Sequence, residues 1–252
     1  MPGSFIRIEN ISHSFQNGYK GLDTINLTIN KGEFIVIAGK NGSGKTLLMK
    51  HLSGLETPDT GDIFYNDISI VKKPESIRGK IGLIFQDADS QILGETVYDD
   101  IAIGPKNLRL KKDEIISITE NVLEWSCLTD KKDNHPYSLS GGEKRRLAIA
   151  GMLAMNCEVM VFDEPFANLD YPSIVNVLQS LVKLQSDGKT VIVLTHELEK
   201  VLSHADRLVI LDNGLIKYDM TTNDIHTIDF NKFGLRNPFV TYTKKEDLTW
   251  LQ

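Results

Sequence analysis

The chain has 252 residues, of which 41% are hydrophobic and 25% are charged, and its formal net charge is −6. This composition is typical of a soluble globular protein with one large domain, or one domain that carries a smaller lobe. The negative net charge argues against a general affinity for nucleic acid or anionic lipid, because both reward clustered positive charge.

The sequence also predicts a cytoplasmic protein without direct membrane insertion. No stretch approaches the roughly 20 apolar residues that cross a bilayer, and the first four residues lack the charged and apolar regions of a signal peptide. Any membrane role should therefore come through a protein partner. The two cysteines, Cys127 and Cys157, have no metal-like spacing, so we expect ordinary thiols.

Two patterns of apolar residues predict strands. Residues 5–8 and 25–29 alternate between apolar and polar, which indicates antiparallel strands with one wetter face. Later runs are apolar at successive positions, as in a parallel sheet that helices cover on both faces. The predicted class is therefore α/β. These later runs are residues 35–38, 81–85, 159–162, 191–195 and 208–211.

Residues 39–46 lie between the first of these runs and a helical stretch that begins at Leu47. They read Gly39-Lys40-Asn41-Gly42-Ser43-Gly44-Lys45-Thr46 and match the phosphate-binding pattern G-x-x-x-x-G-K-[ST]. Polyphosphate needs many converging N–H donors, and the three glycines should leave room that a Cβ would block. We expect Lys45 to bind the β and γ phosphates at a helix N-terminus and Thr46 to hold Mg²⁺. The alternative is a glycine-rich turn without a ligand.

Between residues 87 and 154 helical stripes replace the strand patterns. One stripe contains Ile115, Ile118, Thr119 and Val122, and the other contains Leu147, Ala150, Gly151 and Ala154. We therefore expect a helical lobe, residues 87–154, inserted into an α/β core formed by residues 1–86 and 155–215. Residues 216–252 should form a small C-terminal extension.

The second stripe belongs to a helix that opens at Ser140-Gly141-Gly142-Glu143. Ser140 and Glu143 have the spacing of a capping box, which explains both residues without a ligand. The two glycines need another reason, because each costs about 0.5–1 kcal/mol relative to alanine in a helix. A second phosphate contact would provide that reason.

The run 159–162 ends in two adjacent carboxylates, Asp163 and Glu164. Carboxylates at the carboxyl end of a parallel strand point into the crevice where such folds bind ligands. Asp163 could hold Mg²⁺ through water, and Glu164 could orient an attacking water molecule. An Asp-Glu-Pro turn is also an ordinary way to end a strand.

Six motifs, and the order in which they follow one another along residues 5–211, resemble the nucleotide-binding subunits of ATP-binding-cassette (ABC) transporters. The resemblance implies a P-loop NTPase core with a mixed, mainly parallel sheet, an N-terminal antiparallel β addition and an inserted α-helical lobe. It also implies a dimer in which ATP lies between the phosphate loop of one subunit and residues 140–143 of the other. The motifs are residues 39–46, Gln86, residues 139–143, residues 159–164, residues 167–170 and His196.

The resemblance assigns a role to four further residues. Phe15 would stack on adenine, Gln86 would reach Mg²⁺ and the attacking water, and His196 would contact the γ-phosphate. Asp170 would couple the two sites across the dimer. Each residue also has an ordinary alternative. Phe15 could be a core aromatic and Gln86 a surface residue, while His196 could be structural and Asp170 a helix cap.

Some positions depart from the usual pattern of this family. Leu47 stands where a threonine usually meets the α-phosphate, and Glu143 replaces the usual glutamine. Asn168 and Phe15 are less common choices. None of these changes removes Lys45, the magnesium ligands or Glu164, so activity should survive.

Residues 87–92 and 97–108 resemble the ATPase subunits of energy-coupling-factor importers. The resemblance implies uptake of a vitamin or transition-metal ion, with three partners at the inner face of the cell membrane. These are a second ABC ATPase subunit, identical or different, a transmembrane coupling protein and a membrane substrate-binding protein. The alternative for these residues is a surface loop that leads into any helix.

Other classes of function stay open on the sequence alone. The chain could be an importer subunit of another subtype, or a soluble ABC ATPase with a mechanical or regulatory role. The latter proteins usually carry two fused cassettes, long coiled insertions or basic patches, and none is visible here. A nucleotide sensor with negligible turnover is the third possibility.

Overall fold

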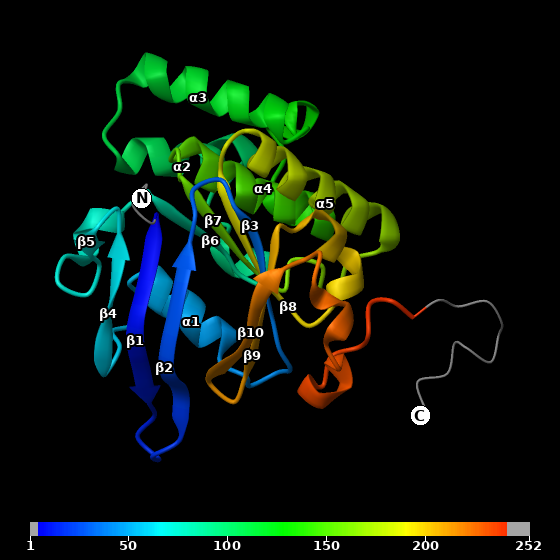
Figure 1. Ribbon diagram of the computed structural model, residues 1–252. Coiled ribbons are helices and arrows are strands. Elements are labelled where there is room, and N and C mark those ends of the chain that lie inside the picture. The colour runs from blue at the N-terminus through cyan, green and yellow to red at the C-terminus, as the bar shows by residue number, and fades with distance from the viewer. Residues whose placement is uncertain (1–4, 241–252) are drawn as a thin grey trace.

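The computed structural model describes residues 5–240, which fold into two β-sheets with helices between and around them (Figure 1). The larger sheet has the strand order β10-β9-β3-β8-β7-β6, in which only β10 is antiparallel to its neighbour. Its strands are β3 (Phe34–Ala38), β6 (Ile81–Ile84), β7 (Val159–Asp163), β8 (Thr190–Thr195), β9 (Arg207–Asp212) and β10 (Leu215–Thr221).

The centre of this sheet is buried on both faces, as the continuous apolar runs predict. Every residue of β3, β7 and β8 is buried. Successive side chains of β3 enter two different cores, with Phe34 and Val36 on one face and Ile35 and Ile37 on the other. The prediction of a parallel sheet between two apolar layers is therefore confirmed.

The smaller sheet is antiparallel, with the order β2-β1-β4-β5. Its strands β1 (Ile6–Ser14) and β2 (Lys20–Ile29) extend the two predicted N-terminal strands, whereas β4 (Thr60–Tyr65) and β5 (Ile68–Ser69) were not predicted. Strand β4 contains Gly61 at φ 84°, where a Cβ would lie 2.4 Å from the backbone oxygens of Glu9 and Asn10. Glycine is therefore needed where β4 approaches the backbone of β1. Because glycine is rare in strands, its presence kept the apolar and polar pattern from indicating one here.

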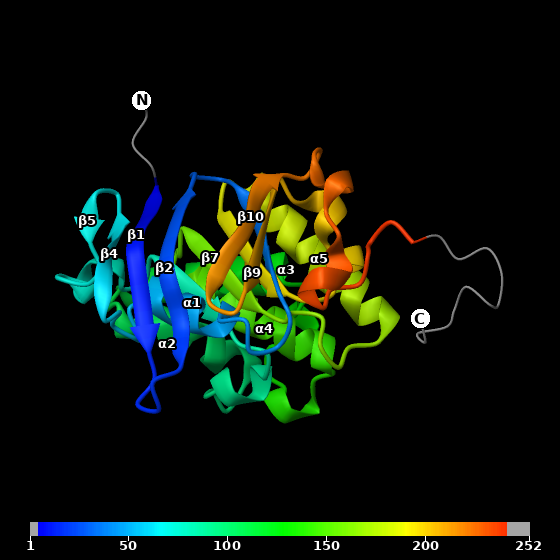
Figure 2. The ribbon, with the colours of Figure 1, turned by 60° about the horizontal axis from the view of Figure 1, so that its bottom comes forward.

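Helix α1 (Lys45–Leu52) lies between the two sheets, as the two views agree (Figures 1 and 2). Its Leu48, Met49 and Leu52 are fully buried in the core that both sheets share. This packing fixes the amino end of α1 beside the carboxyl ends of the parallel strands.

The other face of the large sheet is covered by α4 (Gly141–Ala154) and α5 (Tyr171–Ser186). Helices α2 (Val97–Asn107) and α3 (Lys112–Trp125) pack on α4, with α3 at the top of the molecule in Figure 1. No strand interrupts residues 87–154, as predicted. Helix α4 serves two cores, because Leu147 and Ala150 face α2 and α3 while Ile149 faces the sheet.

The region after β9 contains a strand that the sequence pattern did not predict. Residues Leu215–Thr221 form β10, which pairs with β9 at the edge of the large sheet. Its burial alternates between exposed and half-buried residues, so it lacks the apolar run that marks the inner strands. Residues 241–252 of the predicted C-terminal extension lie outside the described residues. Within residues 5–240 no helix is long and apolar enough to cross a bilayer.

The double burial of β3 generates a stability prediction. Ile35→Ala removes a fully buried side chain from the core shared with α1, so it should lower the free energy of unfolding by about 2–5 kcal/mol. Lys217→Ala on the exposed side of β10 is the matched control and should change it by less than about 0.5 kcal/mol. Urea unfolding measures both variants, and equal losses would contradict this account of the core.

Candidate active site

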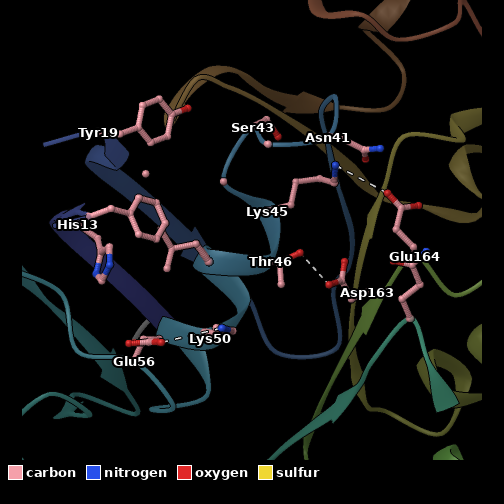
Figure 3. A pocket seen from close by; sticks show the side chains of 16 residues that line it. His13, Tyr19, Asn41, Ser43, Lys45, Thr46, Lys50, Glu56, Asp163 and Glu164 are labelled. Carbon is pink, nitrogen blue, oxygen red and sulfur yellow. Dashed lines mark hydrogen bonds and ion pairs between the residues drawn. The ribbon is translucent and has the colours of Figure 1, made fainter. Parts of the chain in front are cut away.

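A cavity of about 400 Å³ lies where the carboxyl ends of β3, β6 and β7 meet the amino end of α1 (Figure 3). Parallel strands place their carboxyl ends at one edge of the sheet, which brings distant motifs together. The predicted site residues that line the cavity are Phe15, Asn41, Gly42, Ser43, Gly44, Lys45, Thr46, Leu47, Gln86, Asp163 and Glu164.

The loop between β3 and α1 requires its glycines for different reasons. Gly42 and Gly44 have φ angles of 80° and 108°, which other residues rarely adopt. A Cβ on Gly39 would lie 2.2 Å from the Leu211 backbone oxygen. The structure thus gives Gly39 a reason other than the predicted room for phosphate, because its bare backbone lets the loop pack against β9.

The amino end of α1 has free hydrogen-bonding capacity. Its N-cap residue is Gly44, which offers no side chain to the first N–H groups of the helix. The buried Ser43 hydroxyl also has no hydrogen-bond partner in the described part of the chain. An anion with several acceptor oxygens would satisfy these donors and the positive end of the helix dipole.

Lys45 begins α1, and its side chain is only 6% exposed. Its Nζ donates to the Gly39 backbone oxygen at 2.5 Å and lies 3.7 Å from Oε1 of Glu164 (Figure 3). Burial lowers the pKa of this ammonium, and the carboxylates of Glu164 and Asp163 oppose that effect. The cavity therefore combines a buried cation with two carboxylates.

Asp163, the last residue of β7, accepts a hydrogen bond of 2.8 Å from the Thr46 hydroxyl. Burial raises the pKa of this carboxyl, and the bond from Thr46 partly offsets the effect. The pair joins strand β7 to helix α1 and exposes hard oxygen ligands to the cavity.

Glu164 follows in the left-handed backbone conformation, at φ 46°. Its N–H donates to the Leu194 oxygen at 2.8 Å, and Thr195 Oγ1 donates to Oε2 at 2.9 Å. His196 Nδ1 lies 2.8 Å from Oε1. Strained backbone at a held carboxylate is a feature of functional sites. His196 is outside the cavity lining and contacts Glu164, while its predicted contact with a phosphate stays a prediction.

The opposite end of the cavity is aromatic. Phe15 is 45% exposed, so it is not the core aromatic of the alternative reading. Its ring lies 6.2 Å from that of Tyr19, with nearly parallel planes. Pattern analysis missed Tyr19 because the β1–β2 hairpin carries no motif, although a second aromatic four residues after Phe15 was a visible signal. It also missed His13, Gly21, Lys50 and Glu56 in the lining.

The predicted residues at the amino end of α4 do not line this cavity. Ser140 and Glu143 form the expected capping box, with bonds of 2.8 and 3.3 Å between their side chains and backbones. A Cβ on Gly142 would lie 2.8 Å from Ser173 Cβ, so packing against α5 requires this glycine. Gly141 lies in an adjacent groove beside Gln86.

Asp170 and Lys40 also lie outside the lining. Asp170 is the N-cap of α5 and accepts a bond from the Ser173 N–H at 3.1 Å, as the helix-cap alternative states. Lys40 forms an ion pair of 3.2 Å with Asp212. Within one chain, the cavity therefore brings together the phosphate loop, Gln86 and the β7 carboxylates, but not residues 140–143 or Asp170.

Residues 22–167 match the family described as ABC transporter. The energy-coupling factor transporter ATP-binding protein EcfA2 of Clostridium acetobutylicum is 39% identical, over 94% of this chain and 87% of its own length. The protein EcfA1 of Fusobacterium nucleatum is 41% identical, with coverage of 92% and 88%. These relatives agree with the family that the motifs predict.

Solved structures give the same result. The structure of cbiO1 from Clostridium perfringens, described as part of the ABC transporter complex cbiONQ, has a TM-score of 0.82 at 31% identity and covers 88% of this chain and 90% of that chain. The dimeric ATP-binding cassette MJ0796 bound to ADP and Pi has a TM-score of 0.76 at 27% identity, with coverage of 86% and 98%.

The raised pKa of Asp163 predicts how stability depends on pH. The folded state holds the proton more tightly than the unfolded state, so the wild type should lose stability as pH rises from the ordinary value of 3.8 through the raised pKa. Asp163→Asn keeps the acceptor for Thr46 and cannot ionise. Without nucleotide, the Asp163→Asn variant should unfold at a higher temperature than the wild type at about pH 8. The difference between the two unfolding temperatures should become smaller towards about pH 4. Thermal unfolding at both pH values measures this, and a more stable wild type at the higher pH would contradict it.

Proposed function

The chain belongs to the ABC transporter family of ATP-hydrolysing subunits, and we propose that it powers a membrane importer of the energy-coupling-factor type. The assignment of ATP hydrolysis rests on one observation: Lys45, Thr46, Asp163 and the strained Glu164 line the same cavity. The importer subtype is supported by curated relatives that are 36–41% identical over most of their length. Residues 87–92 and 97–108 point to the same subtype.

The polarity of the cavity orients the nucleotide. Tyr19 lies at one end of the cavity, and Lys45, Asp163 and Glu164 lie at the other (Figure 3). The Phe15 ring lies beside Tyr19, so a base would stack at this end. The triphosphate would lie along the phosphate loop, with the amino end of α1 and the Ser43 hydroxyl as donors. Lys45 is placed to bind the β and γ phosphates, and Leu47 offers only an apolar contact.

Mg²⁺ is the expected cofactor of this reaction. Thr46 Oγ1 and Asp163 Oδ2 lie 2.8 Å apart, and Gln86 lines the same cavity, so the donors are the hard oxygens that Mg²⁺ prefers. No group of three His, Cys, Asp or Glu residues in the described part of the chain could hold a metal. Mg²⁺ generally uses few protein ligands and completes its shell with phosphate oxygens and water. When bound, it would neutralise charge on the phosphates.

We assign the orientation of the attacking water to Glu164. Thr195 and His196 hold its two oxygens, which limits the rotation of the carboxylate. Positioning and charge neutralisation account for most catalysis of phosphoryl transfer, and both are arranged before the reaction begins. Gln86 and His196 would contribute further contacts near the γ-phosphate.

Residues 140–143 enter this mechanism from a second subunit. They lie outside the cavity of their own chain, so their contact with ATP requires a second cassette, identical or different. ATP bound between two subunits would favour the closed dimer, and hydrolysis would remove that bridge. The resulting movement of the helical lobes would act on a transmembrane coupling protein at the inner face of the membrane. The imported solute would be a vitamin or a transition-metal ion.

The catalytic assignment predicts the behaviour of Glu164→Gln. The amide keeps the shape and an acceptor for Thr195 but is a poor partner for the water, so kcat should fall about 100-fold or more while ATP affinity is retained. Phosphate release and equilibrium titration with a labelled ATP analogue measure the two quantities. Glu158→Gln, just before the amino end of the same strand, is the control and should keep turnover. Full hydrolysis by Glu164→Gln would refute the assignment.

The importer assignment predicts the partners. Tagged full-length protein, isolated from solubilised membranes, should retain two hydrophobic subunits and a second cassette, and phosphate release should be faster in this complex than in the isolated chain. Mass spectrometry and steady-state phosphate release test both points. Recovery of an active protein from the soluble fraction alone would favour a mechanical or regulatory ATPase.

A further inference from the structure

Arg145 of α4 reaches across to the segment that follows β6. Its side chain is 3% exposed, and its Nη1 and Nη2 donate to the backbone oxygens of Phe85 and Gln86, the latter at 2.8 Å. These partners are 60 and 59 residues away along the chain. Arg145 lies four residues after Gly141, about one helical turn, so the same end of α4 carries the residues 140–143 and the contact with Gln86.

Gln86 lies at the boundary between two hollows of the surface. It lines the nucleotide cavity together with Asp163 and Glu164, and it lines the neighbouring groove together with Gly141 and Arg145. The position of its backbone therefore determines how far its side-chain amide reaches into the cavity.

The backbone around Gln86 is held from two sides. The Gln91 side chain accepts a bond from the Phe85 N–H at 2.8 Å and donates to the Leu83 oxygen at 2.8 Å, which covers the edge of β6. Arg145 holds the carbonyl groups of Phe85 and Gln86. Gln91 belongs to the same segment and moves with it, whereas Arg145 belongs to α4.

Stability alone does not explain Arg145. Burial lowers the pKa of its guanidinium, and the carboxylates of Asp87 and Asp163 only partly oppose this without forming an ion pair with it. Its Nε has no hydrogen-bond partner among the described residues. A buried cation held by carbonyl groups is costly, and an apolar side chain of similar size is often equally stable or better. The fork of two parallel N–H groups, in contrast, fixes both distance and direction.

We propose that Arg145 is a positioning residue that links the amino end of α4 to Gln86. Because one buried side chain joins them through two hydrogen bonds from its planar guanidinium, displacement of α4 moves Gln86 relative to Asp163 and Glu164. Gln86 is then in place for catalysis only when α4 is seated against β6. The proposal rests on the proposed ATPase site and adds the residue that couples residues 140–143 to it within one subunit.

A double-mutant cycle in the complete transporter complex tests this link. Arg145→Met should lower kcat about tenfold with less than about a threefold change in KM, and Arg145→Lys should recover part of the loss. In a Gln86→Ala background the same Arg145→Met change should lower kcat by less than about twofold, because the residue it positions is gone. An equal loss in both backgrounds would mean a merely structural role and would overturn the proposal, as would no loss in either.

Lys144→Met is the matched control. Lys144 is the neighbouring residue on α4 and forms an ion pair of 2.6 Å with the half-exposed Asp89, in the same segment as Gln86. The Lys144 side chain is 16% exposed, but its partner is open to solvent, which weakens the pair, so this variant should keep kcat within about twofold of the wild type. A tenfold loss here would assign the coupling to the charge of α4 and not to Arg145.

Hydrogen exchange gives a second measurement that needs no turnover. Without nucleotide, amides of residues 86–89 should exchange faster in Arg145→Met than in the wild type and unchanged in Lys144→Met. Unchanged exchange in Arg145→Met would overturn the link even if kcat fell. If the wild-type complex releases no phosphate, the proposed function fails, and the exchange data alone decide whether Arg145 holds the segment.

Discussion

The organising constraint of this structure is the burial of opposite charges at one edge of an apolar sheet. Strands β3 and β7 are apolar on both faces, so polar side chains can gather only where these strands end. Lys45, Asp163 and Glu164 meet there, with burial acting against the charge of Lys45 and of Asp163. The arrangement leaves donors at the amino end of α1 and is suited to an anionic ligand that carries a cation.

The same packing separates two parts of the site. Helix α1 lies between the two sheets and presents the phosphate loop, while α4 covers the opposite face of the large sheet. Residues 140–143 therefore cannot complete the cavity of their own chain. In the proposed function, one subunit holds the nucleotide and a second subunit would supply the remaining contacts. Because both subunits would contact the same nucleotide, its hydrolysis would change the contact between them.

Much of the fold could be predicted because its signals are local. The inner strands are short apolar runs, and the phosphate loop is a contiguous pattern in which Gly42 and Gly44 have φ angles that few residues adopt. The missed strands β4, β5 and β10 lie at or near sheet edges and lack a continuous apolar run. The reasons for Gly39 and Gly142 were also out of reach, because a Cβ there would meet Leu211 and Ser173, which are distant in the sequence.

The amino-acid sequence by itself determined the α/β class, the phosphate loop and the two carboxylates at the end of β7. Each of these depends on neighbouring residues, so its physical cause is contained in a short segment. Only the tertiary structure decided that Phe15 and Tyr19 share a cavity with Glu164. It also decided that His196 and Thr195 contact this carboxylate, and that Arg145 donates a hydrogen bond to the backbone oxygen of Gln86. These contacts join segments far apart in the chain, and their geometry follows from how the sheets and helices pack rather than from any local pattern.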